Sequence, residues 1–188
     1  SVADDGTFSV NEEYEFQNGA RRYKVTNIVT ADADGRGRTS YYRERISVPR
    51  TAGQMLPGGD AMANADRIEN ERIVEATVDG ESLRVMHLDG DGRSERELPW
   101  SGEACFPLLA RTVARRSGSV VGPVAMFDPA IEQLVVRSFD GTGARQMVLD
   151  GEKQRVVEVV ETGANGTRGN REWVDAELRT VRRELAGP

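Results

Sequence analysis

Short runs of alternating apolar and polar residues, divided by tight turns, constrain this chain more than any other feature. In residues 7–16, Phe8, Val10, Tyr14 and Phe16 fall on even positions. A two-residue period is typical of a strand with one covered face. Pairs such as Asn18-Gly19 then form turns. Connections of two to five residues make successive strands antiparallel, so the sequence predicts a mainly β fold with antiparallel neighbours.

The pattern predicts about a dozen strands in sequence, which suggests one curved sheet, a β-roll or half-barrel. Asp140-Gly141 is predicted to be the turn between two of them. Residues 49–65 show neither the two-residue period of a strand nor the 3.6-residue period of a helix, so they are predicted to form a long loop. The predicted strands are 7–16, 20–30, 39–48, 66–78, 83–88, 93–100, 119–127, 131–139, 144–150, 154–161, 167–174 and 178–185.

One amphipathic helix is predicted at about 103–116, within a segment 101–118 that separates two β-meanders. Ser101 is the expected cap, Pro107 suits the first turn, and Ser117-Gly118 ends the helix after two arginines. The apolar stripe that should dock on the sheet is Leu108, Leu109, Thr112 and Val113. No internal repeat is found, which argues against a propeller or solenoid. Residues 1–188 are predicted to form a single β-rich domain; the alternative is two small β-lobes divided by the segment 101–118.

The balance of charge argues against a nucleic-acid partner. The chain has 25 Lys and Arg against 31 Asp and Glu, a net charge of -6. The acidic excess lies in residues 51–100, and no segment is net basic as a phosphate-binding face would be. Only Lys24 and Lys153 are lysines, which we interpret as compositional bias.

Apolar stretches are too short to predict a membrane span. The longest, around Val156–Val160, is interrupted by Glu158, whereas a spanning helix needs roughly 18 apolar residues. Ser1–Gly6 has neither a basic nor an apolar region, so no signal peptide is expected in these residues.

A single cysteine and a single histidine limit the chemistry. One cysteine excludes an intrachain disulfide and a multi-cysteine metal site. Cys105 and His87 form the one pair that fits a Cys-His nucleophilic site. The favoured interpretation is that Cys105 packs as a small hydrophobe and His87 is a half-exposed strand residue. The sequence therefore predicts no catalytic residue.

Two Asp-Gly turns begin like calcium loops. Alternate carboxylates follow Asp32 and Asp89, but Arg36 and Arg93 occupy the third ligand position and no glutamate stands at the twelfth. We interpret both as hairpin turns, and no metal or cofactor is predicted.

Three polar residues share the phase of apolar neighbours on their strands: Glu12, Asn27 and Asn70. They would line a wet cavity if buried. The favoured alternative is that each reaches solvent at a strand end or bulge.

Several short motifs in the C-terminal half resemble those of a known group of proteins. Phe127-Asp128-Pro129, Phe139-Asp140-Gly141, Val148–Gly151 and Trp173-Val174-Asp175 followed by Val181–Glu184 resemble segments of uncharacterised bacterial envelope proteins of the β-roll or half-barrel type. These are distantly similar to the outer-membrane lipoprotein carriers. The likeness covers residues 103–185. It implies a periplasmic or secreted location and a concave sheet that holds an acyl chain in the carriers, and it implies no catalytic residue.

The leading hypothesis is a non-catalytic extracytoplasmic domain that acts by binding or as a structural module. A carrier of a hydrophobic or acyl ligand comes second, because 5 Phe, 2 Trp and 5 Met are few residues with which to line a cavity. A Cys-His enzyme comes third. The partner is left open between a protein and a hydrophobic ligand.

Overall fold

The computed structural model describes residues 2–3, 5–50, 66–149, 151–177, 179–184 and 186. Its chain divides into two compact units, an N-terminal unit Ser1–Trp100 and a C-terminal unit Ser101–Pro188. The single domain over 1–188 stays a prediction. Apart from Pro49 and Arg50, the predicted loop 49–65 lies outside the described residues.

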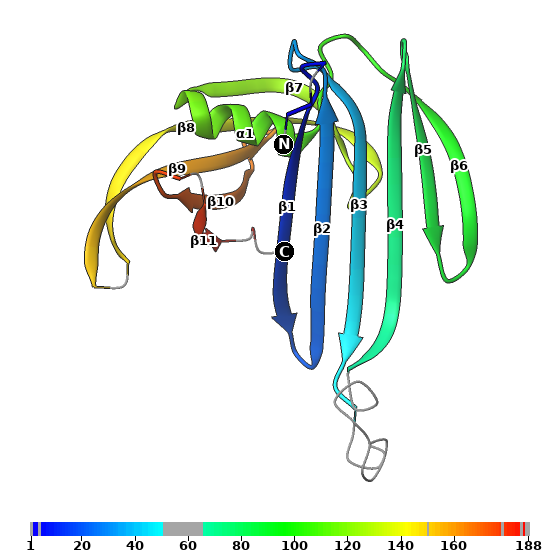
Figure 1. Ribbon diagram of the computed structural model, residues 1–188, viewed down its shortest axis with the longest axis horizontal. Helices are drawn as coiled ribbons and strands as arrows, with labels where there is room; N and C mark the ends of the chain where they lie inside the picture. Colours follow the sequence, from blue (N-terminus) through cyan, green and yellow to red (C-terminus); the bar gives the residue numbers. More distant parts are fainter. Residues whose placement is uncertain are drawn as a thin grey trace. The chain divides into compact units, whose positions relative to one another are not determined.

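The N-terminal unit is a six-stranded antiparallel meander in which each strand pairs with the next along the chain (Figure 1). Gly19 and Gly80 each lie in a tight turn between two strands and have positive φ. Glycine adopts this conformation without steric cost, which allows the tight reversals. The strands are β1 (Phe8–Asn18), β2 (Arg21–Ala31), β3 (Gly37–Val48), β4 (Arg67–Asp79), β5 (Ser82–Asp89) and β6 (Gly92–Pro99).

One face of β2 to β5 is buried and apolar. Tyr42 lies opposite Val74, and Ala76 lies opposite Val85; all four are at most 5% exposed. The sequence period placed these residues on one face, as predicted.

The other face of this sheet carries ion pairs between neighbouring strands. Glu71 on β4 pairs with Arg43 at 2.5 Å and Arg45 at 2.9 Å, both on β3. Such exposed pairs contribute little to stability, but they make this face hydrophilic.

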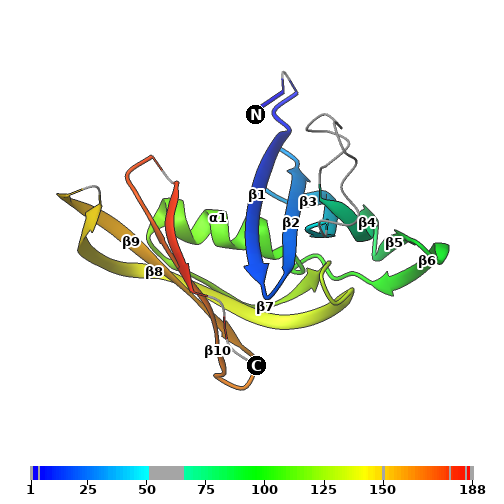
Figure 2. The ribbon, with the colours of Figure 1, turned by 90° about the horizontal axis from the view of Figure 1, so that it is seen from below.

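The C-terminal unit is a five-stranded antiparallel sheet in the order β11-β10-β9-β8-β7. Its helix α1 lies against one face of that sheet (Figure 2). The elements are α1 (Pro107–Ser117), β7 (Val120–Asp128), β8 (Gln133–Leu149), β9 (Glu152–Gly163), β10 (Arg168–Val174) and β11 (Thr180–Glu184).

The core of this unit joins α1 to three strands. Ala110 and Ala114 of the helix pack with Met126, Phe139 and Val159. Small helical residues let the helix backbone approach the strands closely, as Ala114 does at Gly141.

The helix is shorter than predicted. Ser101 does not cap it; Ser101 instead accepts a backbone hydrogen bond from Ala104. Cys105 forms an isolated parallel β-bridge with Met126, and the helix begins after it, at Pro107. Its end at Gly118, in the left-handed conformation, is confirmed. Val113 was wrongly placed on the buried stripe, since it is 46% exposed.

The predicted turn at Asp140-Gly141 is wrong, because β8 runs through it from Gln133 to Leu149. The pairing of β8 with β9 is irregular between Asp140 and Gly143. A Cβ on Gly141 would stand 2.2 Å from the carbonyl oxygen of Ala114. This glycine therefore permits a close approach of helix to strand.

The strands form two separate antiparallel sheets, so the expected single curved sheet is not what the described residues form. Neither sheet is closed or strongly curled in the described part of the chain. None of the described helical residues make a segment long and apolar enough to cross a membrane.

We expect Gly141→Ala to destabilise the C-terminal unit by about 1–3 kcal/mol, because the added methyl group overpacks the contact between α1 and β8. Urea denaturation measures this change. Gly102→Ala is the matched control, since nothing lies within 4 Å of a Cβ there. Equal stabilities of the two variants would contradict the close-approach explanation.

Candidate functional site

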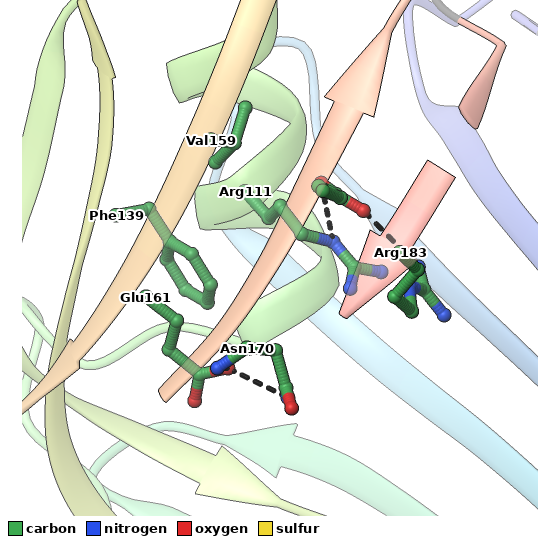
Figure 3. Close-up of a pocket in the computed structure, with 7 residues that line it drawn as sticks. Arg111, Phe139, Val159, Glu161, Asn170 and Arg183 are labelled. Carbon is green, nitrogen blue, oxygen red and sulfur yellow. Dashed lines mark hydrogen bonds and ion pairs between the residues drawn. The ribbon is translucent and has the colours of Figure 1, made fainter. Parts of the chain in front are cut away.

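A small pocket lies beside α1 in the C-terminal unit (Figure 3). Its volume of about 10 Å³ is close to the space that one water molecule needs. Its lining combines two apolar side chains with charged and polar ones. The lining residues are Arg111, Phe139, Val159, Glu161, Asn170, Glu172 and Arg183.

Glu172 on β10 is the most highly paired of the charged lining residues. Arg115 of α1 donates to both of its oxygens, from Nε at 2.7 Å and from Nη2 at 2.5 Å. Arg183 of β11 donates from Nη2 at 3.1 Å, and Nε of Arg111 lies at 3.5 Å. The glutamate side chain is only 4% exposed. Three guanidinium groups thus surround one buried carboxylate.

The charge of Glu172 is maintained by these arginines. Burial alone would raise the pKa of its carboxyl group, but the nearby charges of Arg111, Arg115 and Arg183 outweigh burial, so its pKa lies below the ordinary value. Glu172 is therefore ionised at neutral pH.

Glu161 on β9 has its own partners at the other end of the pocket. It accepts from Nδ2 of Asn170 at 2.8 Å and pairs with Nη1 of Arg137 at 2.7 Å. Arg137 also pairs with Asp128. Both carboxylates of the pocket are thus engaged by side chains of neighbouring elements.

The opposite face of the sheet has a second charged layer around Trp173, which follows Glu172 on β10. Three guanidinium groups lie over the indole ring at 5.1–5.7 Å from its centroid, those of Arg145, Arg171 and Arg182. Glu158 accepts hydrogen bonds from Arg145 and Arg171. Cation–π contacts of this kind cover the ring, which is 3% exposed.

Cys105 lies at the start of the C-terminal unit and His87 lies on β5 of the N-terminal unit. Burial raises the pKa of the Cys105 thiol to about 11, so the thiol is protonated at neutral pH. This environment fits the small-hydrophobe interpretation and not an activated nucleophile.

His87 is half-buried, and its Nε2 lies 2.9 Å from Oδ2 of Asp89. The hydrogen bond with His87 lowers the pKa of Asp89. An open hollow of about 270 Å³ lies beside this pair at the β5–β6 turn. The prediction of a half-exposed strand histidine is confirmed.

In both turns that begin like calcium loops, the first aspartate accepts a backbone hydrogen bond from a residue of the same turn. Oδ1 of Asp32 accepts from the Arg36 N–H at 2.8 Å, and Oδ1 of Asp89 accepts from the Asp91 N–H at 2.9 Å. Among the described residues, no group of three or more His, Cys, Asp or Glu is placed to hold a metal ion.

The three in-phase polar residues are not brought into one cavity. Glu12 and Asn27 lie directly opposite each other on β1 and β2, and Oδ1 of Asn27 is buried without a hydrogen-bond partner. Asn70 is exposed, as the solvent-facing alternative predicted for it.

The comparisons with known proteins found no match among family models, curated proteins or solved structures. The resemblance to envelope β-rolls and lipoprotein carriers therefore stays a prediction.

The arginine–glutamate cluster was not predicted from the sequence. One signal was present. Arg111 and Arg115 stand four residues apart on the helix, so they share a face beside the apolar stripe.

We expect Glu172→Gln to lower the free energy of unfolding by about 3–5 kcal/mol, because it leaves three guanidinium groups without their common counter-charge. Urea denaturation at pH 7 measures the loss. Glu177→Gln is the control, because that side chain is 65% exposed and should change stability little.

The same substitution should alter the pH dependence of stability. The folded pKa of Glu172 lies below its ordinary value of 4.5. Its contribution is therefore present above pH 4.5 and is lost as the pH falls through the lower folded value. Stability curves of the wild type and Glu172→Gln should converge in acid, and a constant gap down to pH 2 would contradict this role.

We expect Cys105 to resist iodoacetamide at pH 7.5 and to react fully in urea, because the native thiol is protonated and partly buried. Mass spectrometry counts the adducts. Complete labelling of the native protein within minutes would instead favour the Cys-His hypothesis.

Proposed function

We propose that this chain is a non-catalytic extracytoplasmic β-domain that acts by binding or as a structural module. The observation that carries the proposal is the pairing of the buried carboxylates in the C-terminal unit. Glu172, Glu158 and Glu161 each accept from two or more neighbouring side chains.

This pairing suits a scaffold better than an active site. A general acid or base needs a pKa near the working pH and an open approach to its substrate. Glu172 has a lowered pKa and a side chain 4% exposed. Its arginines come from α1 and β11, so the interaction links the helix to the far strands of the sheet.

The pocket beside Glu172 does not support the acyl-carrier alternative. Its volume of about 10 Å³ accommodates about one water molecule, far less than an acyl chain occupies. Most of its lining side chains are charged or polar, which disfavours a hydrocarbon.

The location outside the cytoplasm rests on the resemblance to envelope proteins. Fractionation of the host cells followed by immunoblotting tests it. The proposal expects the protein in the periplasmic or secreted fraction, and recovery from the cytoplasm alone would contradict it.

The non-catalytic role is tested by incubating the purified protein with a metabolite extract and following all masses over time. We expect no conversion. A conversion that disappears with Cys105→Ala or His87→Ala would overturn the proposal in favour of an enzyme.

A fluorescent fatty-acid probe tests the carrier alternative in the same preparation. We expect no saturable rise in fluorescence and no lipid in the native mass spectrum. Stoichiometric, saturable binding would establish the carrier function instead.

A further inference from the structure

Strand β1 forms one edge of the N-terminal sheet and pairs with β2 alone (Figure 1). It runs from Phe8 to Asn18, and its pairing with β2 is continuous, without a bulge. Among the described residues, the isolated bridge on this strand joins Val2 to Phe8, at its start. From Val10 onward β1 is therefore an open edge, which presents backbone groups to a further strand.

The hairpin turn shows which backbone groups point outward. Two residues join β1 to β2, so Asn18 faces Arg21. In a turn of this length the carbonyl of the first residue accepts from the N–H of the fourth, which makes this a hydrogen-bonded pair. Such pairs alternate with non-bonded pairs along an antiparallel ladder. The residues whose N–H and C=O groups point away from β2 are therefore Asn11, Glu13, Glu15 and Gln17.

The other three sheet edges each carry a feature that hinders strand addition. Strand β6 ends in Pro99, the pairing of β7 is irregular between Val121 and Val124, and β11 is only five residues long. Prolines, bulges and short strands are the usual protections of an edge. Strand β1 has eleven residues, no proline, no lysine and no bulge, so in the described part of the chain it is the edge best suited to accept a strand.

The exposed side chains of β1 make this edge acidic. Glu13 and Glu15 lie on the same face of the strand, and both are exposed. Their contacts are with β2: Oγ1 of Thr26 donates to Glu13 at 3.3 Å, and Nζ of Lys24 lies 3.5 Å from Glu15. No described residue pairs with either carboxylate on the open side of the strand.

This charge pattern selects the kind of strand that fits. Two copies of β1 paired about Tyr14 would set Glu13 opposite Glu15 of the other copy, and like charges directly opposite are destabilising. A strand with basic residues two positions apart would instead place a cation opposite each glutamate, which is stabilising. Repulsion of one partner and attraction of another together give specificity.

The opposite face of β1 is more apolar. Val10, Tyr14 and Phe16 are half-buried there, and the rings of Tyr14 and Phe16 lie 6.2 Å apart. Side chains alternate between the two faces of a strand. An added strand would therefore present its basic residues to the glutamates and its intervening residues to this apolar face.

We propose that β1 binds an extended, basic segment of another protein as a seventh strand of the sheet, with arginine or lysine opposite Glu13 and Glu15. In this mode of recognition the main-chain hydrogen bonds supply affinity and the alternate side chains supply specificity. The inference rests on the binding function proposed above and states the chemistry of the partner.

A peptide in which arginine alternates with threonine is the probe, since threonine favours strands. It is titrated into the isotope-labelled full chain and followed by NMR. We expect saturable shifts of the amide resonances of residues 11–17, with a Kd between about 10 μM and 1 mM that weakens as salt is added. The same peptide with glutamate in place of arginine is the control. No saturation by about 1 mM, or equal binding of the two peptides, would overturn the inference.

Charge reversal tests the recognition of the basic side chains. The double variant Glu13→Lys with Glu15→Lys should bind the arginine peptide about tenfold more weakly and should prefer the glutamate peptide. This reversed preference would also show that the variant is folded. Glu177→Lys is the matched control, because that side chain is 65% exposed and lies in the C-terminal unit. A double variant with the preference of the wild type would contradict the assigned role of the two glutamates.

A proline tests the backbone bonds separately from the charges. Asn11→Pro removes an outward N–H and no bond to β2, so it should weaken peptide binding while circular dichroism shows the sheet intact. Asn11→Thr keeps the N–H and is the control. A peptide methylated on alternate backbone nitrogens tests the same bonds without altering the protein. If neither change weakened binding, charge alone would hold the peptide and strand addition would be wrong.

Sedimentation velocity of the chain alone tests the alternative occupant. We expect a monomer, and a dimer abolished by Asn11→Pro would overturn the inference in favour of a second copy. Absence of peptide binding would overturn this inference alone, whereas conversion of a metabolite in the experiment above would overturn the non-catalytic role.

Discussion

The ion pair between Glu172 and the arginines around it is the interaction on which the C-terminal unit depends. Apolar contacts hold α1 over β7, β8 and β9, through Ala110 and Ala114. Glu172 adds the connection to β10 and, through Arg183, to β11. A helix of eleven residues is marginal alone in water, so its place is fixed by these two kinds of contact together.

Much of the fold was predictable because its determinants are local. Alternation gave the strands of the N-terminal meander, and Asp-Gly and Asn-Gly pairs gave its turns. Gly118 ended the helix where expected. The prediction failed at Gly141, where the same Asp-Gly signal marks a close approach to Ala114. A local rule cannot distinguish a glycine in a hairpin turn from a glycine at a close helix–strand contact. The contact depends on Ala114, which lies 27 positions before Gly141 in the chain.

The charged cluster was not predictable for a related reason. Arg115 and Glu172 are separated by 57 residues, and their meeting requires both the docking of α1 and the register of β10. The number of separate sheets likewise depends on which strands pair with each other. The predicted strand positions alone do not contain that information. Sequence period assigns a residue to a face of its own strand, but it does not say which charges the neighbouring elements bring to that face.

The near absence of lysine takes on a physical meaning in this unit. A guanidinium group presents a planar fork that binds both oxygens of a carboxylate and stacks on aromatic rings, whereas an ammonium group is a compact point charge. Arg115 uses the fork on Glu172, and Arg171 combines a carboxylate contact with a cation–π contact to Trp173. An abundance of arginine in the composition does not by itself produce these geometries. Lysine at either position would keep the charge and lose the planar fork of the guanidinium group, so these contacts depend on arginine itself.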